Sequence, residues 1–295
     1  MKFIKKWYTY QKERFPILIY GTYMLTVVLA VFFVTNYLKY QNDFSKDKLE
    51  WIIIVPMFAV SFLQFLMIRI VDEFKDYEED CKYRPYRPVP RGLVSLKELG
   101  VIFVICAIIQ VVVSCVYTNC IPLIPVWIFF FIMSKGYFMK RFIDKHLLFE
   151  VALDEILMPL LAVYLIGFVD INILVNSPLI YVFLFLTYII AWIVEIARKI
   201  RCKEDEEKGV RTYTAVLGIK KATSLLWFLE TILFVLQMVL LWSKNIYLPI
   251  IVFVLIGIIN VLFMVKQNKK MAKLTELSAN IYIMIVYLSM AILII

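Results

Sequence analysis

The sequence predicts an all-α integral membrane protein, a bundle of about nine transmembrane helices. Of its 295 residues 63% are hydrophobic, and the mean hydropathy is +0.84. A soluble globular chain has roughly 45–50% apolar residues, so this excess is too large for a water-soluble core. Apolar runs near the ~20 residues that cross a bilayer recur along the whole chain. These runs do not alternate in the manner of the strands of a membrane β-barrel.

The apolar runs place the helices in order along the chain. The expected spans are 16–38, 51–70, 99–117, 121–138, 147–169, 179–200, 223–242, 246–265 and 277–295. The first run follows a basic segment, but it is long enough to span and lacks a small-residue cleavage site, so it predicts a membrane helix rather than a removed signal. Between the third and fourth spans, Asn119 and Pro122 indicate a tight turn. We expect one domain over residues 1–295, with motif loops at about 71–98 and 195–221.

The charged residues orient the bundle. Lysines and arginines gather before the first span and after the second, fourth, sixth and eighth spans. The alternate connections contain few basic residues, except for the connection between the first and second spans. By the positive-inside rule the N-terminus is cytoplasmic, and an odd number of spans places the C-terminus on the opposite side of the cell membrane. The net charge of +9 therefore reflects topology. We expect the lipid bilayer, and not a nucleic acid, as the partner of this charge.

Other familiar site types are not supported. The five cysteines are odd in number and lack metal-type spacing, so no disulfide framework is implied. With His146 as the single histidine, neither a zinc site nor a Ser/His/Asp triad can be assembled.

The first chemistry-bearing segment ends the second span. Asp72, Asp76 and Asp80 follow one another at four-residue steps, which stacks them on one face of a helix. Three like charges on one stripe repel each other unless cations lie among them. Mg²⁺ is commonly bound through one or two carboxylates and substrate phosphates. A solvated acidic helix end is the plainer interpretation, and the spacing alone leaves both open.

A proline-rich loop follows directly and carries arginines at positions 84, 87 and 91. Arginines on a stiff loop can hold phosphate oxygens bidentately. Residues needed only for topology would not require the prolines, so the loop favours an anion site over a purely topological role.

The second segment ends the sixth span on the same side of the membrane. Glu195 and Lys199 are four residues apart, so a helical ion pair is the simplest explanation for them. An acidic run from Glu204 to Glu207 follows, within a group of basic residues. A second cluster of acids and bases beside the first is what a diphosphate site requires, because carboxylates hold metal and cations stabilise the leaving group.

At this point the sequence resembles the UbiA superfamily of intramembrane prenyltransferases, which are nine-helix bundles with acidic motifs after the second and sixth helices. The family's first motif, followed by Arg-Pro-x-Pro-x-Gly, matches Asp72, Asp76, Asp80 and the stretch from Arg87 to Gly92. A basic pair after the fourth helix matches Lys140 and Arg141, and the end of the second motif matches Asp205, Gly209 and Thr212.

The resemblance implies a mechanism and a set of residues. Mg²⁺ would bridge the aspartates and the diphosphate of an isoprenoid donor, the allylic C–O bond would ionise, and a small electron-rich acceptor would capture the cation. The implied metal ligands are Asp72, Asp76, Asp80, Glu204 and Asp205. The implied diphosphate-binding residues are Arg87, Lys140, Arg141, Lys199 and Arg211, with Lys199 and the three aspartates as the catalytic residues.

The sequence departs from the family at two positions. The usual first acid of the second motif falls on Arg201, which cannot bind a cation, and Glu195 or Glu204 is the candidate substitute. Asp72 stands where asparagine is more frequent. A terpene cyclase of the same superfamily, a membrane transporter or a non-catalytic assembly protein are the alternatives. Against a transporter, most charge is gathered at one membrane face rather than near the midplane.

Asp154 and Glu155 lie inside the predicted fifth span. Acids within a membrane are costly and tend to face a cavity, where they would meet a polar group of the acceptor. Alternatively the span begins later and both acids lie near the interface.

Overall fold

The structure, a computed structural model, describes residues 2–40, 45–143, 145–206, 211–241 and 247–294. Within these ranges it contains helices and no strand, as the sequence predicts. The long helices are α2 (Ile17–Tyr40), α3 (Ile54–Lys75), α5 (Leu96–Tyr117), α11 (Leu179–Arg198), α13 (Ile219–Leu240), α14 (Tyr247–Lys266) and α15 (Lys269–Ile294). The shorter helices are α1 (Lys2–Arg14), α4 (Tyr77–Tyr83), α6 (Leu123–Ser134), α7 (Lys140–Ile143), α8 (Leu147–Asp154), α9 (Leu157–Ile166), α10 (Ile173–Asn176) and α12 (Tyr213–Leu217).

Seven of the described helices are long and apolar enough to cross a membrane. The chain is therefore a multi-pass membrane protein, and the predicted fold class is confirmed. The count of nine spans is not confirmed. The two expected spans without a full-length helix are 121–138 and 147–169, which correspond to α6 and to the pair α8 and α9.

These two regions are short or interrupted for visible local reasons. Helix α6 has 12 residues, which is about 18 Å of helix against a hydrocarbon core of ~30 Å. It starts after Pro122, and beyond its end Gly136 and Tyr137 have positive φ angles of 59° and 54°. Helices α8 and α9 are separated at Glu155 and Ile156, directly after Asp154.

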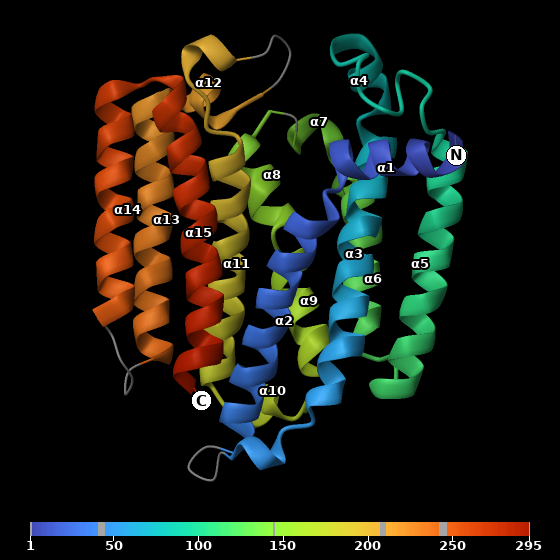
Figure 1. Ribbon diagram of the computed structural model, residues 1–295, viewed down its shortest axis with the longest axis vertical. Helices are drawn as coiled ribbons and strands as arrows, with labels where there is room; N and C mark the ends of the chain where they lie inside the picture. The colour runs from blue at the N-terminus through green and yellow to red at the C-terminus, as the bar shows by residue number, and fades with distance from the viewer. Residues whose placement is uncertain (1, 41–44, 144, 207–210, 242–246, 295) are drawn as a thin grey trace.

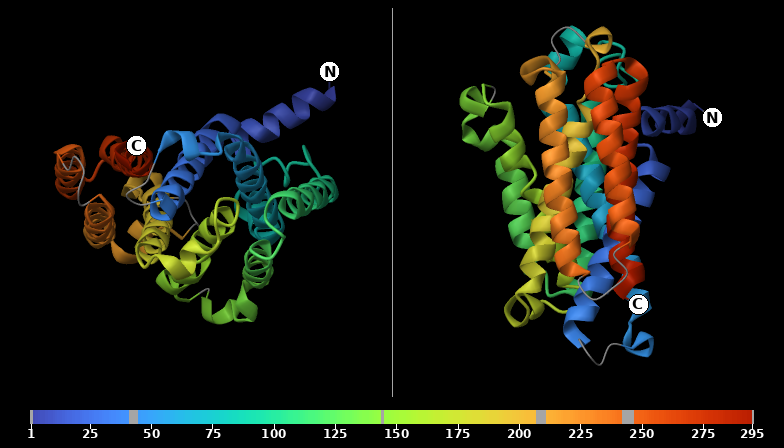
Figure 2. Two further views of the ribbon diagram at one scale, coloured as in Figure 1. Left: turned by 90° about the horizontal axis from the view of Figure 1, so that it is seen from below. Right: turned by 90° about the vertical axis from the view of Figure 1, so that its left-hand side faces the viewer.

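The long helices run side by side in two groups with a central one between them (Figures 1 and 2). On one side α13 packs against α14 and α11, and α14 packs against α15. On the other side α3 packs against α5 and α6. Helix α2 lies between them and contacts α15, α3 and α9. Because α3 and α11 both finish at the same end of the bundle, the two motif segments are brought together there (Figure 1). We call this the motif end, comprising the last turns of α3 and α11 with α1, α4 and α12; α15 finishes at the opposite end.

Helix α1 lies across the motif end instead of crossing the bundle (Figure 1). Its Tyr10 is buried with Ile70 of α3 and Leu99 of α5, and with Val89 and Val94 of the proline-rich loop. Helix α5 begins at a capping box, in which Ser95 and Glu98 each satisfy a backbone N–H at the helix start. Lys6 of α1 donates to the same Glu98 at 2.5 Å, so α1 is fastened to the start of α5.

Candidate functional site

The first motif keeps its helical spacing although the helix is divided. Helix α3 finishes at Lys75 and α4 starts at Tyr77, with Asp76 between them. The Asp76 amide donates to the Asp72 carbonyl at 2.9 Å, and the Asp80 amide donates to the Asp76 carbonyl at 2.8 Å. The three aspartates therefore occupy successive turns, as the sequence predicts.

Their surroundings nevertheless differ. The Asp80 carboxylate is 2% exposed and lies among arginines: Arg87 at 2.6 Å, Arg84 at 3.3 Å and Arg14 at 4.0 Å. Arg87 thus ties the proline-rich loop to the end of the acidic segment. The loop itself is a series of turns that closes at Gly92, whose φ of 76° lies in the left-handed region favoured by glycine.

Asp72 is accessible and interacts with groups on other helices of the motif end. Its carboxylate lies 3.6 Å from Arg69 and is 37% exposed, and it interacts electrostatically with Asp76, Arg198 and Asp154. Asp76 is partly exposed, and no ion pair to it is found among the described residues. Asp72 and Asp76 are therefore the two aspartates of the motif that remain accessible.

The sequence analysis did not identify the buried ion pairs that hold this motif in place. Glu73, 1% exposed, accepts hydrogen bonds from Arg14 at 2.5 Å and from Arg69 at 3.1 Å. The four-residue step from Arg69 to Glu73 was a usable signal. Nothing in the sequence indicated Arg14, because it lies 59 residues away from its partner.

The second segment is dominated by ion pairs. Glu195 pairs through one carboxylate oxygen with Arg198 and through the other with Lys199, each at 2.5 Å. The predicted helical pairing of Glu195 with Lys199 is thus present. Lys199 also lies over the ring of the buried Tyr213, 5.9 Å from its centre. Burial, and secondly the charge of Glu195, raise the pKa of the Tyr213 hydroxyl, so it stays protonated.

The later acids of this segment also have partners. Asp205 pairs with Lys269 of α15 at 2.5 Å, and this hydrogen bond is the main reason why the pKa of the Asp205 carboxyl is lowered. Glu206 accepts hydrogen bonds from Thr212 and Thr214, and Thr212 in turn caps α12. Glu204 is exposed. Positions 207–210, including Gly209 of the matched motif, lie outside the described residues.

Two further arginines bridge separate parts of the motif end. Arg201 lies 3.5 Å from Glu276 of α15. Arg211, one of the predicted diphosphate-binding residues, lies 3.2 Å from Glu150 of α8. The backbone of Lys140 and Arg141 forms α7, but their side chains lie outside what the structure describes.

The break between α8 and α9 brings more acids to the motif end. Asp154 accepts a hydrogen bond from the Tyr137 hydroxyl at 2.6 Å and interacts electrostatically with Lys75, Glu195 and Lys199. Glu155 interacts with Glu195 and Arg198. The two acids that were unexplained in the sequence thus stand at a helix break, facing the second motif. Both acids were visible in the sequence, but the helix break that positions them was not predicted.

The donor chemistry of these groups tests which of them suit a divalent cation. Among the described residues no group of three or more metal-type side chains comes together. Asp72 and Asp76 suit Mg²⁺, because one or two carboxylates, completed by substrate phosphates, are a common arrangement. Asp80, Glu204 and Asp205 remain predicted ligands; of these, Asp80 and Asp205 are engaged by basic side chains.

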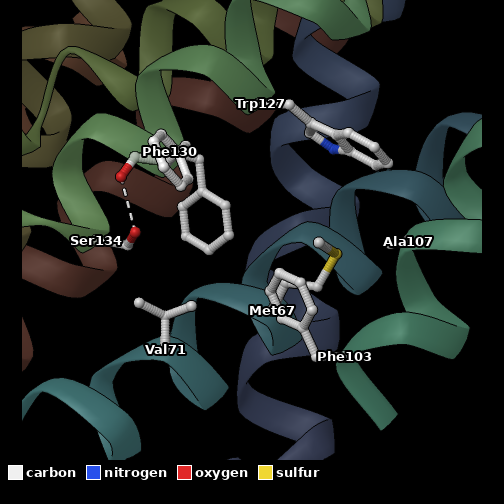
Figure 3. Close-up of a pocket in the computed structure, with 8 residues that line it drawn as sticks. Met67, Val71, Phe103, Ala107, Trp127, Phe130 and Ser134 are labelled. Atoms are coloured by element: carbon white, nitrogen blue, oxygen red, sulfur yellow. Dashed lines mark hydrogen bonds between the residues drawn. The ribbon is translucent and has the colours of Figure 1, made fainter. Parts of the chain in front are cut away.

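An apolar cavity of about 210 Å³ lies beside the first motif, among α3, α5 and α6 (Figure 3). Val71, adjacent to Asp72 in the chain, lines it together with Met67, Phe103 and Ala107. Trp127 and Phe130 line it from α6. The cavity therefore offers apolar volume beside the helix that carries a candidate metal ligand.

The fold and this site define a multi-pass helical membrane protein with an acidic and basic site gathered at one end of its bundle. The chain belongs to the UbiA prenyltransferase family, whose family model it matches over residues 44–284. The resemblance noted in the sequence is thereby confirmed. A comparison with curated proteins gave no match.

Two solved structures share the fold. One, described as digeranylgeranylglyceryl phosphate synthase in membranes, has 18% identity, covers 98% of this chain and 99% of its own, and superposes with a TM-score of 0.66. The other, the ligand-free structure of a UbiA homolog from Aeropyrum pernix K1, has 14% identity, covers 91% and 96%, and gives a TM-score of 0.62. Membership of the family supports intramembrane prenyltransferase activity in general, and these neighbours show the shared fold.

Proposed function

We propose that the protein transfers a prenyl or polyprenyl group from an isoprenoid diphosphate to a small electron-rich acceptor, with Mg²⁺ as cofactor. The observation that carries this proposal is that Asp72, at the end of α3, interacts electrostatically with Arg198, at the end of α11, where Arg198 and Lys199 both pair with Glu195. Carboxylates for a metal and cations for a leaving group are the two requirements of diphosphate chemistry.

Each group of residues has a separate role in the proposed reaction. Asp72 and Asp76 would hold the metal, which when bound neutralises charge on the diphosphate. Arg198 and Lys199 stabilise the electron pair that passes to the diphosphate as the allylic C–O bond breaks. The allylic carbon then bonds to the acceptor, and the acceptor releases a proton. Asp80 and Arg87 keep the proline-rich loop in place.

Release of inorganic diphosphate by the purified protein tests this function. Geranyl, farnesyl, geranylgeranyl and longer donors are supplied with and without Mg²⁺, against a panel of aromatic, quinone-precursor, tetrapyrrole and glycerol-lipid acceptors. Metal-dependent release with formation of a prenylated acceptor supports the proposal. Release without an acceptor, yielding a cyclised terpene, points to a cyclase, and failure to bind any donor points to a transporter or assembly protein.

The apolar cavity leads to a prediction about donor length. If the isoprenoid tail enters the cavity beside Val71, Ala107→Phe fills that space, and catalysis with long donors falls by about tenfold or more relative to geranyl diphosphate. Competition between two donors in one reaction measures the ratio. Ile108→Phe is the matched control, because Ile108 is exposed on the same helix and does not line the cavity. Equal losses with all donors would place the tail elsewhere.

We further propose that the motif end is cytoplasmic in the cell membrane and that the C-terminus lies on the opposite side, as the distribution of lysine and arginine indicates. Cys81 is exposed in α4 at the motif end, and Asp47 is exposed in the connection between α2 and α3 at the other end.

Maleimide labelling of single-cysteine variants in intact cells tests this topology. A membrane-impermeant maleimide is expected to label a variant whose one cysteine is Asp47→Cys, and to spare a variant that retains only Cys81 until the membrane is permeabilised. The reverse pattern would invert the proposed orientation.

A further inference from the structure

The second motif segment offers little free carboxylate for a metal. Both oxygens of Glu195 are paired with cations, and both oxygens of Glu206 accept hydrogen bonds from threonine hydroxyls. Asp205 is paired with Lys269. Within the described part of the segment this leaves the exposed Glu204 alone. A lone exposed carboxylate is a weak basis for a second metal site.

The same segment instead presents cations. Arg198 is 55% exposed and Lys199 is 33% exposed, so both side chains are open to a ligand. Arg198 interacts electrostatically with Asp72, and Lys199 interacts with Asp154 and Glu155. Through Arg198 this pair of cations thus interacts with Asp72, one of the two candidate metal ligands.

Glu195 holds the two cations in position. It is 11% exposed in its side chain and pairs with both at 2.5 Å, which fixes the guanidinium and the ammonium next to each other at the end of α11. A guanidinium matches phosphate oxygens bidentately and stays charged at every physiological pH. The two groups carry two positive charges, of which the Glu195 carboxylate offsets one, so the cluster keeps a net positive charge for an anion.

We propose that Arg198 and Lys199 bind the donor diphosphate directly in place of a second metal ion, so that the site takes one Mg²⁺, at Asp72 and Asp76. This inference rests on the proposed function and specifies how its site recognises the diphosphate. Arg201, at the position where the family motif has an acid, is consistent with a segment that uses fixed cations.

Metal counting tests the inference directly. Mn²⁺, as a paramagnetic substitute for Mg²⁺, is titrated into purified protein saturated with a non-cleavable prenyl thiolodiphosphate, and bound ions are counted by electron paramagnetic resonance. One bound Mn²⁺ per chain is expected, and Asp76→Asn should abolish that signal. Two bound ions per chain would overturn the inference while leaving prenyl transfer intact.

Diphosphate binding without metal is the second readout. In the presence of a chelator, inorganic diphosphate should bind the unaltered protein, and Arg198→Gln or Lys199→Gln should each weaken binding by about tenfold or more. Lys220→Gln is the matched control, because Lys220 is exposed on α13 near the same end. Unchanged metal-free binding in both variants would also overturn the inference.

A double variant distinguishes a loss of diphosphate binding from a folding defect. Arg198→Gln leaves Glu195 with one cation, whereas Arg198→Gln combined with Glu195→Gln keeps a neutral hydrogen-bonding pair. The double variant should stay folded and still bind diphosphate weakly. If the unaltered protein binds neither diphosphate nor the thiolodiphosphate even with metal, the proposed function itself fails.

Discussion

Asp76→Ala is expected to reduce metal-dependent diphosphate release by about a hundredfold or more, which corresponds to ~2.7 kcal/mol of transition-state stabilisation. Asp76 is the connecting residue between α3 and α4, and no ion pair to it is found in the described ranges. Its removal therefore takes away a metal ligand without leaving a buried partner uncompensated, so the protein should fold normally. Steady-state release of diphosphate at saturating donor and Mg²⁺ measures the effect.

Glu78→Ala is the control for this variant. Glu78 lies two residues further along, is exposed on α4 and carries the same charge. It should retain nearly all activity. Equal losses in both variants would mean that general acidity, and not a metal ligand at Asp76, supports the reaction.

Arg14→Ala is expected to destabilise the protein by about 3–5 kcal/mol, because it breaks a buried ion pair on one side only. Arg14 is 9% exposed, pairs with Glu73 at 2.5 Å and approaches Asp80 at 4.0 Å. Without it the 1% exposed Glu73 depends on Arg69 alone. The melting temperature in detergent should fall by several degrees, and diphosphate release should fall as the first motif loses its support.

Lys12→Ala tests whether this effect depends on charge in general. Lys12 lies on the same helix but is exposed, and an exposed charge contributes little to stability. Its melting temperature should be unchanged. The double variant Arg14→Met, Glu73→Gln should recover part of the melting temperature lost in Arg14→Ala, because replacing both partners of a buried ion pair is often nearly neutral for stability. A stable Arg14→Ala protein would contradict the role given to α1.

The sequence was sufficient for the membrane class and most of the spans, because hydrophobic length is a local property. It was also sufficient for the spacing of Asp72, Asp76 and Asp80, which follows from helical periodicity. It failed to anticipate the short α6 and the break between α8 and α9. Both regions are apolar enough to resemble full spans, and their ends are set by local turns that hydropathy does not report.

The site was predicted less completely than the fold, because composition does not reveal which charges pair. Arg87 lies in the predicted loop, yet the structure places it on Asp80. Asp205 lies in the predicted motif, yet its partner is Lys269, which is 64 residues away. Such partners are fixed only when distant helices pack, and the sequence alone carries no signal for them.

The contacts of α1 also set an order of events during synthesis. This helix is synthesised well before two of its partners: Glu13 pairs with Arg91 and Lys6 with Glu98, 78 and 92 residues further along. Helix α1 can therefore contact α3 first, through Arg14 and Glu73, but it cannot complete its contacts until the start of α5 has been made. The proline-rich loop packs on the same residues of α1 and α5, so its packing cannot be completed before that moment either.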